Sequence, residues 1–143
     1  MSKKSSEEKP KLHVEAGESA EIAGRLGAEI ATQFGPRDET SLSILARSAG
    51  GALVGGLNGV VHWRWLYIRH LWVAETARSA GIGRELIAAA EAQARTRNCV
   101  GLYIDTFDQN IARYYERAGF LRAGEIAGFP PGGRRIYLSK GLS

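Results

Sequence analysis

Apolar positions near the N-terminus of the chain follow two different periods. Residues 12–15 alternate apolar and polar side chains, which is typical of a short strand. From Ser19, whose hydroxyl can cap a helix, apolar side chains recur every four residues. They are Ile22, Leu26 and Ile30. The pattern predicts a first strand followed by an amphipathic helix.

The middle of the chain changes from strand patterns to a helix. Residues 42–47 and 52–57 predict a β-hairpin. Glycines 55, 56 and 59 interrupt its apolar second strand and favour a close backbone approach or a bulge. Residues 65–73 are rich in aromatic and β-branched side chains, as expected of a central strand that is buried on both faces. Residues 82–97 place one apolar stripe at helical spacing, and Asn98 suits a left-handed stop. The stripe consists of Leu86, Ile87, Ala90 and Ala94.

The C-terminal third predicts a strand, a short helix and a hairpin. The strand covers residues 100–104, the helix residues 111–118, and the hairpin residues 120–126 with 135–138. The order of elements predicts an α/β (α+β) fold, a mixed sheet with helices on its faces. Because a helix connects the strands at 65–73 and 100–104, these two strands should be parallel. A ligand crevice is then expected beyond their carboxyl ends, beside residues 74–83.

Composition restricts the class of protein. A chain of 143 residues with 44% hydrophobic content predicts a single domain, over residues 12–143, after a disordered tail at residues 1–11. No apolar run approaches the length of a spanning helix and the first residues are polar, so we expect a cytoplasmic protein without a membrane partner. The lone Cys99 suits a reducing compartment. The net charge of +4 comes with no basic stripe on an ordered element, so no nucleic-acid partner is expected.

Glycines mark the start of the predicted long helix. The pattern Arg78-x-x-Gly81-x-Gly83 follows the central strand, at a point where backbone N–H groups lack intrahelical acceptors. Such a helix start favours phosphate oxygens, although glycines at a helix entrance more often serve only a turn. A dinucleotide-binding motif would need glycine where Leu86 stands, and no Gly-Lys-Ser/Thr of a P-loop is present. The pattern is therefore compatible with a phosphate-bearing ligand of another kind.

Two motifs together resemble one known family. The stretch 71–86, which contains Leu-Trp-Val and Arg-Ser-Ala-Gly-Ile-Gly-Arg, is similar to the acyl-CoA-binding signature of the GCN5-related N-acetyltransferases (GNAT). Residues 115–120, Tyr-Glu-Arg-Ala-Gly-Phe, resemble their second marker. The strand at 65–73, Asp-Thr-Phe at 105–107 and Pro-Pro-Gly at 130–132 resemble a compact bacterial branch of the family.

The resemblance implies a fold and a cofactor. It implies a twisted sheet of about six to seven strands, splayed at the central parallel pair and flanked by about three helices. Acetyl-CoA would bind in the gap between the splayed strands, and no metal is implied. The implied cofactor-binding residues are Leu71, Trp72, Val73, Arg78, Ser79, Ala80, Gly81, Ile82, Gly83, Arg84 and Asn110. Asn110 is included because Asp108 stands where many members have a cofactor-binding Asn.

The resemblance also implies candidate catalytic residues. Tyr115 matches the tyrosine that acts as general acid toward the departing thiolate, and the alternative is a core aromatic residue. The attacking amine must lose a proton, because an alkylammonium has a pKa of roughly 10. Candidate bases are His70 and Asp105. The structural alternatives are a hydrogen-bonded histidine in the sheet and a carboxylate that caps the helix near residue 108.

Two hypotheses for function follow. The first is acetyl transfer from acetyl-CoA to a primary amine, of a small molecule or a protein, by direct attack in a ternary complex. The alternative is a CoA-binding sensor or regulatory domain with the same fold and weak catalysis. The aromatic residues Trp63, Trp65 and Tyr67 are candidates for an acceptor pocket, for the core, or for a homodimer interface.

Overall fold

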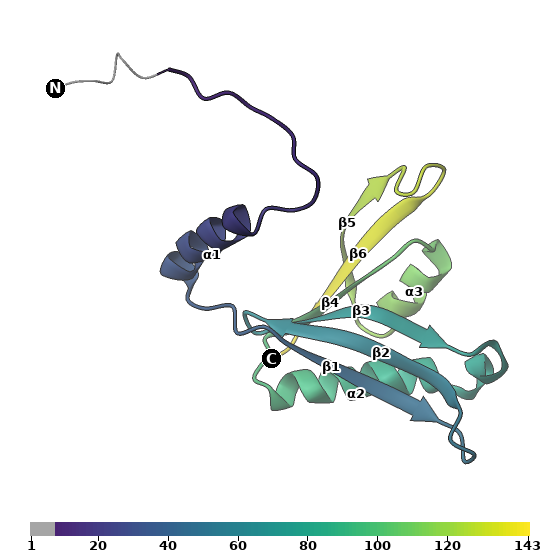
Figure 1. The fold of residues 1–143 in the computed structure, drawn as a ribbon. Coiled ribbons are helices and arrows are strands. Elements are labelled where there is room, and N and C mark those ends of the chain that lie inside the picture. The colour runs from purple at the N-terminus through teal and green to yellow at the C-terminus, as the bar shows by residue number, and fades with distance from the viewer. Residues whose placement is uncertain (1–7) are drawn as a thin grey trace. The chain divides into compact units, whose positions relative to one another are not determined.

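The computed structural model describes residues 8–143, which form two compact units, one ending at Pro36 and the other spanning Arg37–Ser143 (Figure 1). The part of the predicted tail at residues 1–7 lies outside the described residues. In chain order the elements are α1 (Ala20–Phe34), β1 (Thr40–Arg47), β2 (Leu53–His62), β3 (Trp65–Val73), the 3-10 helix η2 (Glu75–Ala80), α2 (Ile82–Thr96), β4 (Gly101–Thr106), α3 (Gln109–Arg117), β5 (Leu121–Ala127) and β6 (Arg134–Gly141).

The N-terminal unit contains the helix α1. The predicted helix is confirmed: the Ser19 hydroxyl accepts a hydrogen bond from the Ile22 N–H at 3.2 Å. The strand predicted at residues 12–15 is wrong, because this segment forms no ladder and its side chains at Leu12 and Val14 are almost fully exposed. A strand needs a neighbour that satisfies its backbone groups, and alternation in four residues does not supply one.

The second unit is built on one six-stranded sheet. The strand order is β1-β2-β3-β4-β6-β5, in which β3 and β4 are parallel and every other neighbouring pair is antiparallel. The predicted mixed sheet with a central parallel pair is therefore confirmed. The predicted hairpins correspond to β1 with β2 and to β5 with β6.

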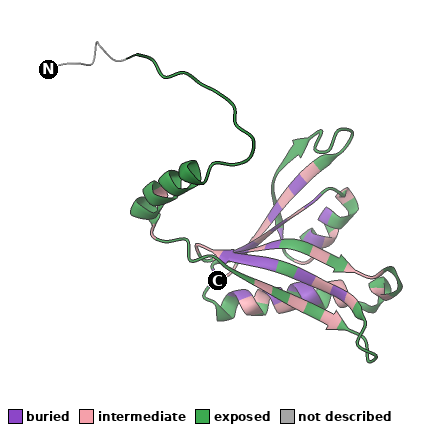
Figure 2. Cartoon of the chain, in the orientation of Figure 1, coloured by how far each residue is buried: buried purple, intermediate pink, exposed green. Residues whose placement is uncertain are grey.

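The core of this unit lies on one face of the sheet. Helices α2 and α3 contribute to a single apolar cluster with that face, and α2 does so through the predicted stripe. Buried residues alternate with more exposed ones along β4, β6 and the first half of β3 (Figure 2). The central strand β3 buries Leu66 and Ile68, whereas Tyr67 is only half-buried, so the prediction of a strand buried on both faces is wrong. Within this unit both helices cover the same face, and aromatic side chains supply the hydrophobicity of the other.

Helix α2 ends as its sequence predicts. Asn98 has φ +61°, a left-handed conformation, and the Cys99 N–H donates to the Ala94 carbonyl at 2.8 Å. Cys99 itself is buried, and burial raises the pKa of its thiol. No helix among residues 8–143 is long and apolar enough to cross a membrane.

Gly101 provides a test of the sheet packing. A Cβ at Gly101 would lie 2.4 Å from the Trp65 ring and 2.9 Å from the Lys140 carbonyl, whereas a Cβ at its strand partner Gly141 would meet nothing within 4 Å. Gly101→Ala should lower the free energy of unfolding by about 1–3 kcal/mol through overpacking. Gly141→Ala should change it by less than about 0.5 kcal/mol. Urea denaturation of both variants checks the contrast, and equal stabilities would contradict the close contact at Gly101.

Candidate active site

The parallel strands β3 and β4 separate halfway along β3. Their pairing runs from Trp65 with Gly101 to Ile68 with Ile104, although β3 continues for five more residues (Figure 1). A bulge explains the separation: β2 pairs Gly59 with Ile68 and Asn58 with His70, so Arg69 is an extra residue on β3. Such an extra residue bends its strand and increases the local twist. The glycines of β2 predicted a bulge or a close backbone approach, and both occur: the bulge lies beside Gly59, although its extra residue is on β3, and a Cβ at Gly56 would lie 2.9 Å from the Ile44 carbonyl.

Beyond Ile68 the backbone of β3 has no strand partner on the side of β4, although it remains paired with β2 on the other side. The Ala74 N–H donates to the Val54 carbonyl, so in the antiparallel register Trp72 pairs with Gly56 through its backbone. Because hydrogen-bonded residues alternate in such a ladder, Leu71 and Val73 direct their N–H and C=O groups away from β2, toward the gap. The Val73 carbonyl accordingly accepts a hydrogen bond from Arg78 Nε at 3.1 Å. An extended ligand with amide groups could therefore pair with this edge of β3.

A cleft of about 590 Å³ opens between the end of β3, the start of α2, and α3. Its lining residues are Leu71, Trp72, Val73, Arg78, Ser79, Gly81, Gly83, Arg84, Ile111, Tyr114 and Tyr115. The structure thus brings together most of the predicted cofactor residues with the predicted catalytic tyrosine. Ile111 and Tyr114 also line the cleft but were not predicted, and only the tertiary arrangement of α3 brings them there.

The start of α2 presents unpaired N–H groups to this cleft. Gly81 precedes the helix with φ +80° and ψ 12°, and no side chain caps the helix. The first intrahelical bond runs from the Glu85 N–H to the Gly81 carbonyl, so the N–H groups of residues 82–84 have no intrahelical acceptor. The helix dipole adds to the attraction for an anion. Arg84, which has no hydrogen bond or ion pair within residues 8–143, supplies positive charge beside them.

Three predicted cofactor residues lie outside the cleft lining. Ala80 is exposed at the end of η2, and Ile82 packs toward Gly55 and the core. Asn110 is exposed at the start of α3, where its side-chain oxygen accepts a hydrogen bond from Arg113. Asp108, not Asp105, caps α3 by accepting hydrogen bonds from the N–H groups of residues 110 and 111, so the capping alternative for Asp105 is wrong.

Tyr115 lies at the inner end of the cleft. Its ring is buried, with 6% of its surface exposed, and its hydroxyl has no hydrogen-bond partner within residues 8–143. Burial, together with the charges of Tyr114 and Asp105, raises the pKa of Tyr115 to about 12. The hydroxyl is therefore protonated at neutral pH and can donate a hydrogen bond into the cleft.

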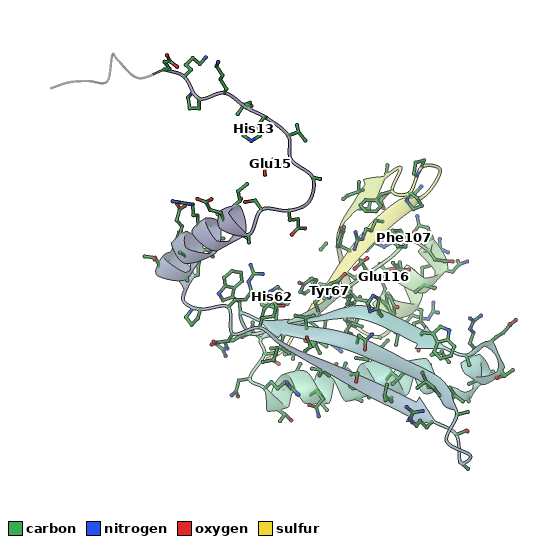
Figure 3. All side chains as sticks on the ribbon, in the orientation of Figure 1. His13, Glu15, His62, Tyr67, Phe107 and Glu116 are labelled. Atoms are coloured by element: carbon green, nitrogen blue, oxygen red, sulfur yellow. The ribbon has the colours of Figure 1, made fainter. Side chains whose placement is uncertain are left out.

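Asp105 belongs to a hydrogen-bonded cluster on the sheet face opposite the helices. Its Oδ1 accepts from the Tyr67 hydroxyl at 2.6 Å and its Oδ2 accepts from Arg135 Nε at 2.8 Å (Tyr67 is labelled in Figure 3). The Tyr67 ring stacks on Tyr103 with centroids 4.6 Å apart. Burial and the Asp105 carboxylate raise the pKa of Tyr67 to about 12. The side chain of Asp105 is only 8% exposed, so two donors hold a nearly buried charge.

His70 directly follows Arg69, the extra residue of the β3 bulge. Its Nδ1 is 3.2 Å from Asn58 Nδ2 on the neighbouring strand β2. It lines a small hollow together with Trp72 and residues of β1 and β2, and it does not line the cleft that holds Tyr115. The side chain thus extends toward β2 and not toward the gap with β4.

Only the three-dimensional register assembles the cluster around Asp105. Arg135 was absent from the predicted site, since it lies 30 residues from Asp105 in the sequence. No local motif links them, and the pairing of β4 with β6 brings them together. Within residues 8–143, no group of three or more His, Cys, Asp or Glu side chains could hold a metal ion.

Comparison with known proteins shows the family. The sequence profile of the Acetyltransferase (GNAT) family matches residues 8–120. Blasticidin-S acetyltransferase of Streptomyces morookaense is 46% identical over 93 residues, which make up 64% of this chain and 68% of that protein. The chain therefore belongs to the GNAT family of acetyltransferases and is an acetyl-CoA-dependent acyltransferase. The resemblance inferred from the two motifs is confirmed.

Solved structures support the same assignment. A crystal structure from Agrobacterium tumefaciens, described as that of an acetyltransferase, superimposes with a TM-score of 0.79 and 34% identity, and covers 93% of this chain and 100% of that chain. A structure from Bacillus anthracis str. Ames, described as that of a proposed streptothricin acetyltransferase in complex with acetyl coenzyme A, shares the fold with a TM-score of 0.64. It is 24% identical, and the match covers 76% of this chain and 64% of that one.

The chemistry of the cleft fits the family's cofactor. Phosphate oxygens are acceptors, and the uncapped start of α2 offers donors and positive charge. The pantetheine arm contains amides, and the edge of β3 offers unpaired N–H and C=O groups. Acetyl-CoA, when bound, supplies an activated acetyl thioester.

Gly81 tests the helix start as a phosphate site. A valine cannot adopt φ +80° without a cost of about 1–2 kcal/mol, whereas asparagine tolerates this region better. Gly81→Val should therefore raise the Kd for CoA by roughly 5- to 30-fold, and Gly81→Asn by clearly less. Calorimetric titration with CoA measures both. Wild-type affinity in the valine variant would exclude this loop from cofactor binding.

Proposed function

We propose that the protein transfers the acetyl group of acetyl-CoA to a primary amine by direct attack in a ternary complex. One observation carries this proposal: the unpaired edge of β3, the uncapped start of α2 and the Tyr115 hydroxyl all border one cleft. The edge of β3 suits the pantetheine amides and the start of α2 suits the pyrophosphate. The Tyr115 hydroxyl would then lie beside the thioester. The observation supports catalysis as well as binding.

Separate segments of the cleft would hold the cofactor. The N–H groups of residues 82–84, with Arg78 and Arg84, would bind the pyrophosphate. The backbone of Leu71 and Val73 would pair with the pantetheine amides, while Trp72 keeps its own backbone bonds with β2. Ser79, Gly81 and Gly83 border the same region, and small residues there leave room for the phosphate oxygens.

Tyr115 would stabilise the departing thiolate. An ordinary thiol has a pKa of about 8.5, and the Tyr115 pKa is about 12, so complete proton transfer from Tyr115 would be uphill by roughly 5 kcal/mol. A hydrogen bond from the hydroxyl to the sulfur avoids this free-energy cost, because the proton stays on Tyr115. We therefore assign Tyr115 the role of a general acid that acts chiefly through a strong hydrogen bond, with full transfer only as the amine releases its own proton.

Water is the acceptor that we favour for the proton of the amine. Both oxygens of Asp105 already accept hydrogen bonds, and proton capture there would disrupt the contact with Tyr67 or with Arg135. His70 extends toward Asn58 and away from Tyr115. These contacts argue against a dedicated base at either residue and support deprotonation through solvent.

Direct attack is favoured over a covalent enzyme intermediate. Cys99 is the only cysteine of the chain. It is buried at the end of α2, its thiol pKa is raised by burial, and it does not line the cleft. A buried thiol with a raised pKa is a poor nucleophile. The acetyl group would therefore pass to the amine in one step.

The acceptor that we propose is a small-molecule amine. Blasticidin-S acetyltransferase is named for a small-molecule substrate, as is nourseothricin acetyltransferase, whose crystal structure is 26% identical to this chain with a TM-score of 0.65. Acetylation of any such amine at a substantial rate would also exclude the alternative of a CoA-binding sensor.

The two neighbouring tyrosines of α3 allow a matched kinetic test. Tyr115→Phe should lower kcat by roughly 10- to 100-fold, the value of one hydrogen bond to a developing charge, with CoA affinity nearly intact. Tyr114 lies near Gly83, since a Cβ there would be 3.1 Å from the Tyr114 hydroxyl. Tyr114→Phe should therefore act mainly on the KM for acetyl-CoA. Steady-state kinetics on both variants separates these effects, and an unchanged kcat in Tyr115→Phe would remove its assigned role.

The raised pKa of Tyr115 also makes a prediction for pH. Because the pKa is raised to about 12, the hydroxyl keeps its proton through pH 10, where an ordinary tyrosine is half ionised. The rate should rise with pH as the amine becomes neutral, and it should show no fall near pH 10 that comes from Tyr115. A pH profile of kcat, with circular dichroism as a control for folding, measures this. A falling limb near pH 10 that disappears in Tyr115→Phe would contradict it.

A further inference from the structure

The sheet face opposite the helices adjoins the inner end of the cleft. In β3 and β4 the buried residues alternate with Tyr67, Tyr103 and Asp105, so these three side chains point away from α2. Asp105 follows Ile104, the last β4 residue that pairs with β3, so it lies where the two strands begin to separate. An amine that attacks a thioester beside Tyr115 can therefore approach over Tyr67 and Asp105.

We infer that this face binds amines that also carry a carboxylate, and that Arg69 and Arg135 hold the carboxylate. The inference rests on the proposed function, since it assigns the acceptor class of the same site. It depends on three features of the face. Asp105 already has hydrogen-bond donors, Arg135 has donors that are not used, and Arg69 lies beside Tyr67.

The carboxylate on this face is not free to receive a substrate cation. Asp105 is nearly buried, and each of its oxygens accepts a hydrogen bond, one from Tyr67 and one from Arg135. The other carboxylate whose charge reaches Tyr103 is Glu39, which lies 3.9 Å from Arg37. Each acidic group near the face therefore has a basic partner.

Arg135 has donors left over. It uses Nε for Asp105, and a hydrogen-bonding interaction with Tyr67 acts to lower the pKa of that residue. A guanidinium carries five N–H donors, so these two contacts leave donors on its terminal nitrogens unused. Its guanidinium carbon lies 5.0 Å from the Phe129 ring centroid, 5.6 Å from that of Phe107 and 5.2 Å from that of Tyr137 (Phe107 is labelled in Figure 3). These rings hold the planar group in place but offer no hydrogen-bond acceptor for it. A ligand carboxylate can accept from the two terminal nitrogens together.

Arg69 approaches Tyr67 from β3. As the extra residue of the bulge it has no partner on β2, and its guanidinium carbon lies 5.8 Å from the Tyr67 ring centroid. It makes no hydrogen bond or ion pair within residues 8–143. Two arginines with unused donors thus flank Tyr67, one from β3 and one from β6.

The positive charge also suits the chemistry. A nearby cation disfavours the charged form of an amine and lowers its pKa, so more of the acceptor is present as the neutral nucleophile. A polycation would gain nothing from this face and would be repelled by Arg69. In an amine that also carries a carboxylate, the arginines attract the carboxylate, and their positive charge lowers the pKa of the amine.

The test compares amines that differ only in a carboxylate. The acceptors are glycine with methylamine, L-phenylalanine with phenethylamine, and L-arginine with agmatine, each assayed for acetyl-CoA turnover. The carboxylate member should have a kcat/KM about tenfold or more above its partner, the value of one charge-assisted hydrogen bond. Turnover without this preference, or a preference for agmatine, would overturn the inference and leave the proposed function standing.

Charge-matched variants locate the effect. Arg69→Gln should reduce the kcat/KM ratio within each pair by about tenfold, while Arg47→Gln should leave it unchanged. Arg47 is an exposed arginine whose Nη1 donates to the Gly51 carbonyl in the β1–β2 turn, so its variant loses the same charge elsewhere. Equal ratios in the two variants would exclude Arg69.

Product binding tests the inference without turnover. Calorimetry in the presence of CoA compares N-acetyl-L-phenylalanine with N-acetylphenethylamine, and the carboxylate form should bind about tenfold more tightly in the wild type but not in Arg69→Gln. If no amine is acetylated, the proposed function fails. In that case the difference in affinity between the two N-acetyl compounds still decides whether this face binds a carboxylate. Equal affinities would refute the inference.

Discussion

The structure around the cleft depends on a sheet that does not close between β3 and β4. One extra residue, Arg69, bends β3 after Ile68, and the parallel ladder stops there. The backbone groups of Leu71 and Val73 then face a gap, although buried N–H and C=O groups normally have partners. Arg78 satisfies one of them, the Val73 carbonyl. A bound amide chain would satisfy the remainder, so the proposed cofactor site is a position on the sheet that an additional strand could occupy.

A second incomplete element faces the same gap. Helix α2 begins at a left-handed glycine that cannot cap it, and the N–H groups of residues 82–84 remain without intrahelical acceptors. An unsatisfied strand edge and an unsatisfied helix start are each common. Their convergence on one cleft, with Arg84 beside them, makes the combination suitable for a molecule with amides at one end and phosphates at the other.

The opening has two electrostatically different sides. On the helix side Tyr115 is buried, protonated and without a hydrogen-bond partner within residues 8–143, so it can serve a developing negative charge. On the other side Asp105 is held between Tyr67 and Arg135 and acts as a fixed part of the wall. The same carboxylate contributes to the raised pKa of both Tyr67 and Tyr115. The two sides are therefore linked by charge, although different elements carry them.

Much of the site could be read from the sequence because it depends on short-range features. The glycines at 81 and 83, the stripe of α2, the Ser19 cap and the stop at Asn98 all reflect contacts within a few residues along the chain. The family motifs share this local character, and they located the cleft and Tyr115. Asp108 is a partial exception, since its capping role is local but was assigned as an alternative for Asp105.

What the tertiary structure decided involves pairing between distant residues. The alternation at residues 12–15 did not yield a strand, because a strand exists only where a neighbour completes its ladder. Likewise, the apolar run of β3 could not show that helices cover only one of its faces within residues 37–143. The contact of Asp105 with Arg135 arises from the register of β4 against β6. Sequence periodicity determined which elements form, whereas the register between strands, set by long-range packing, determined which side chains meet.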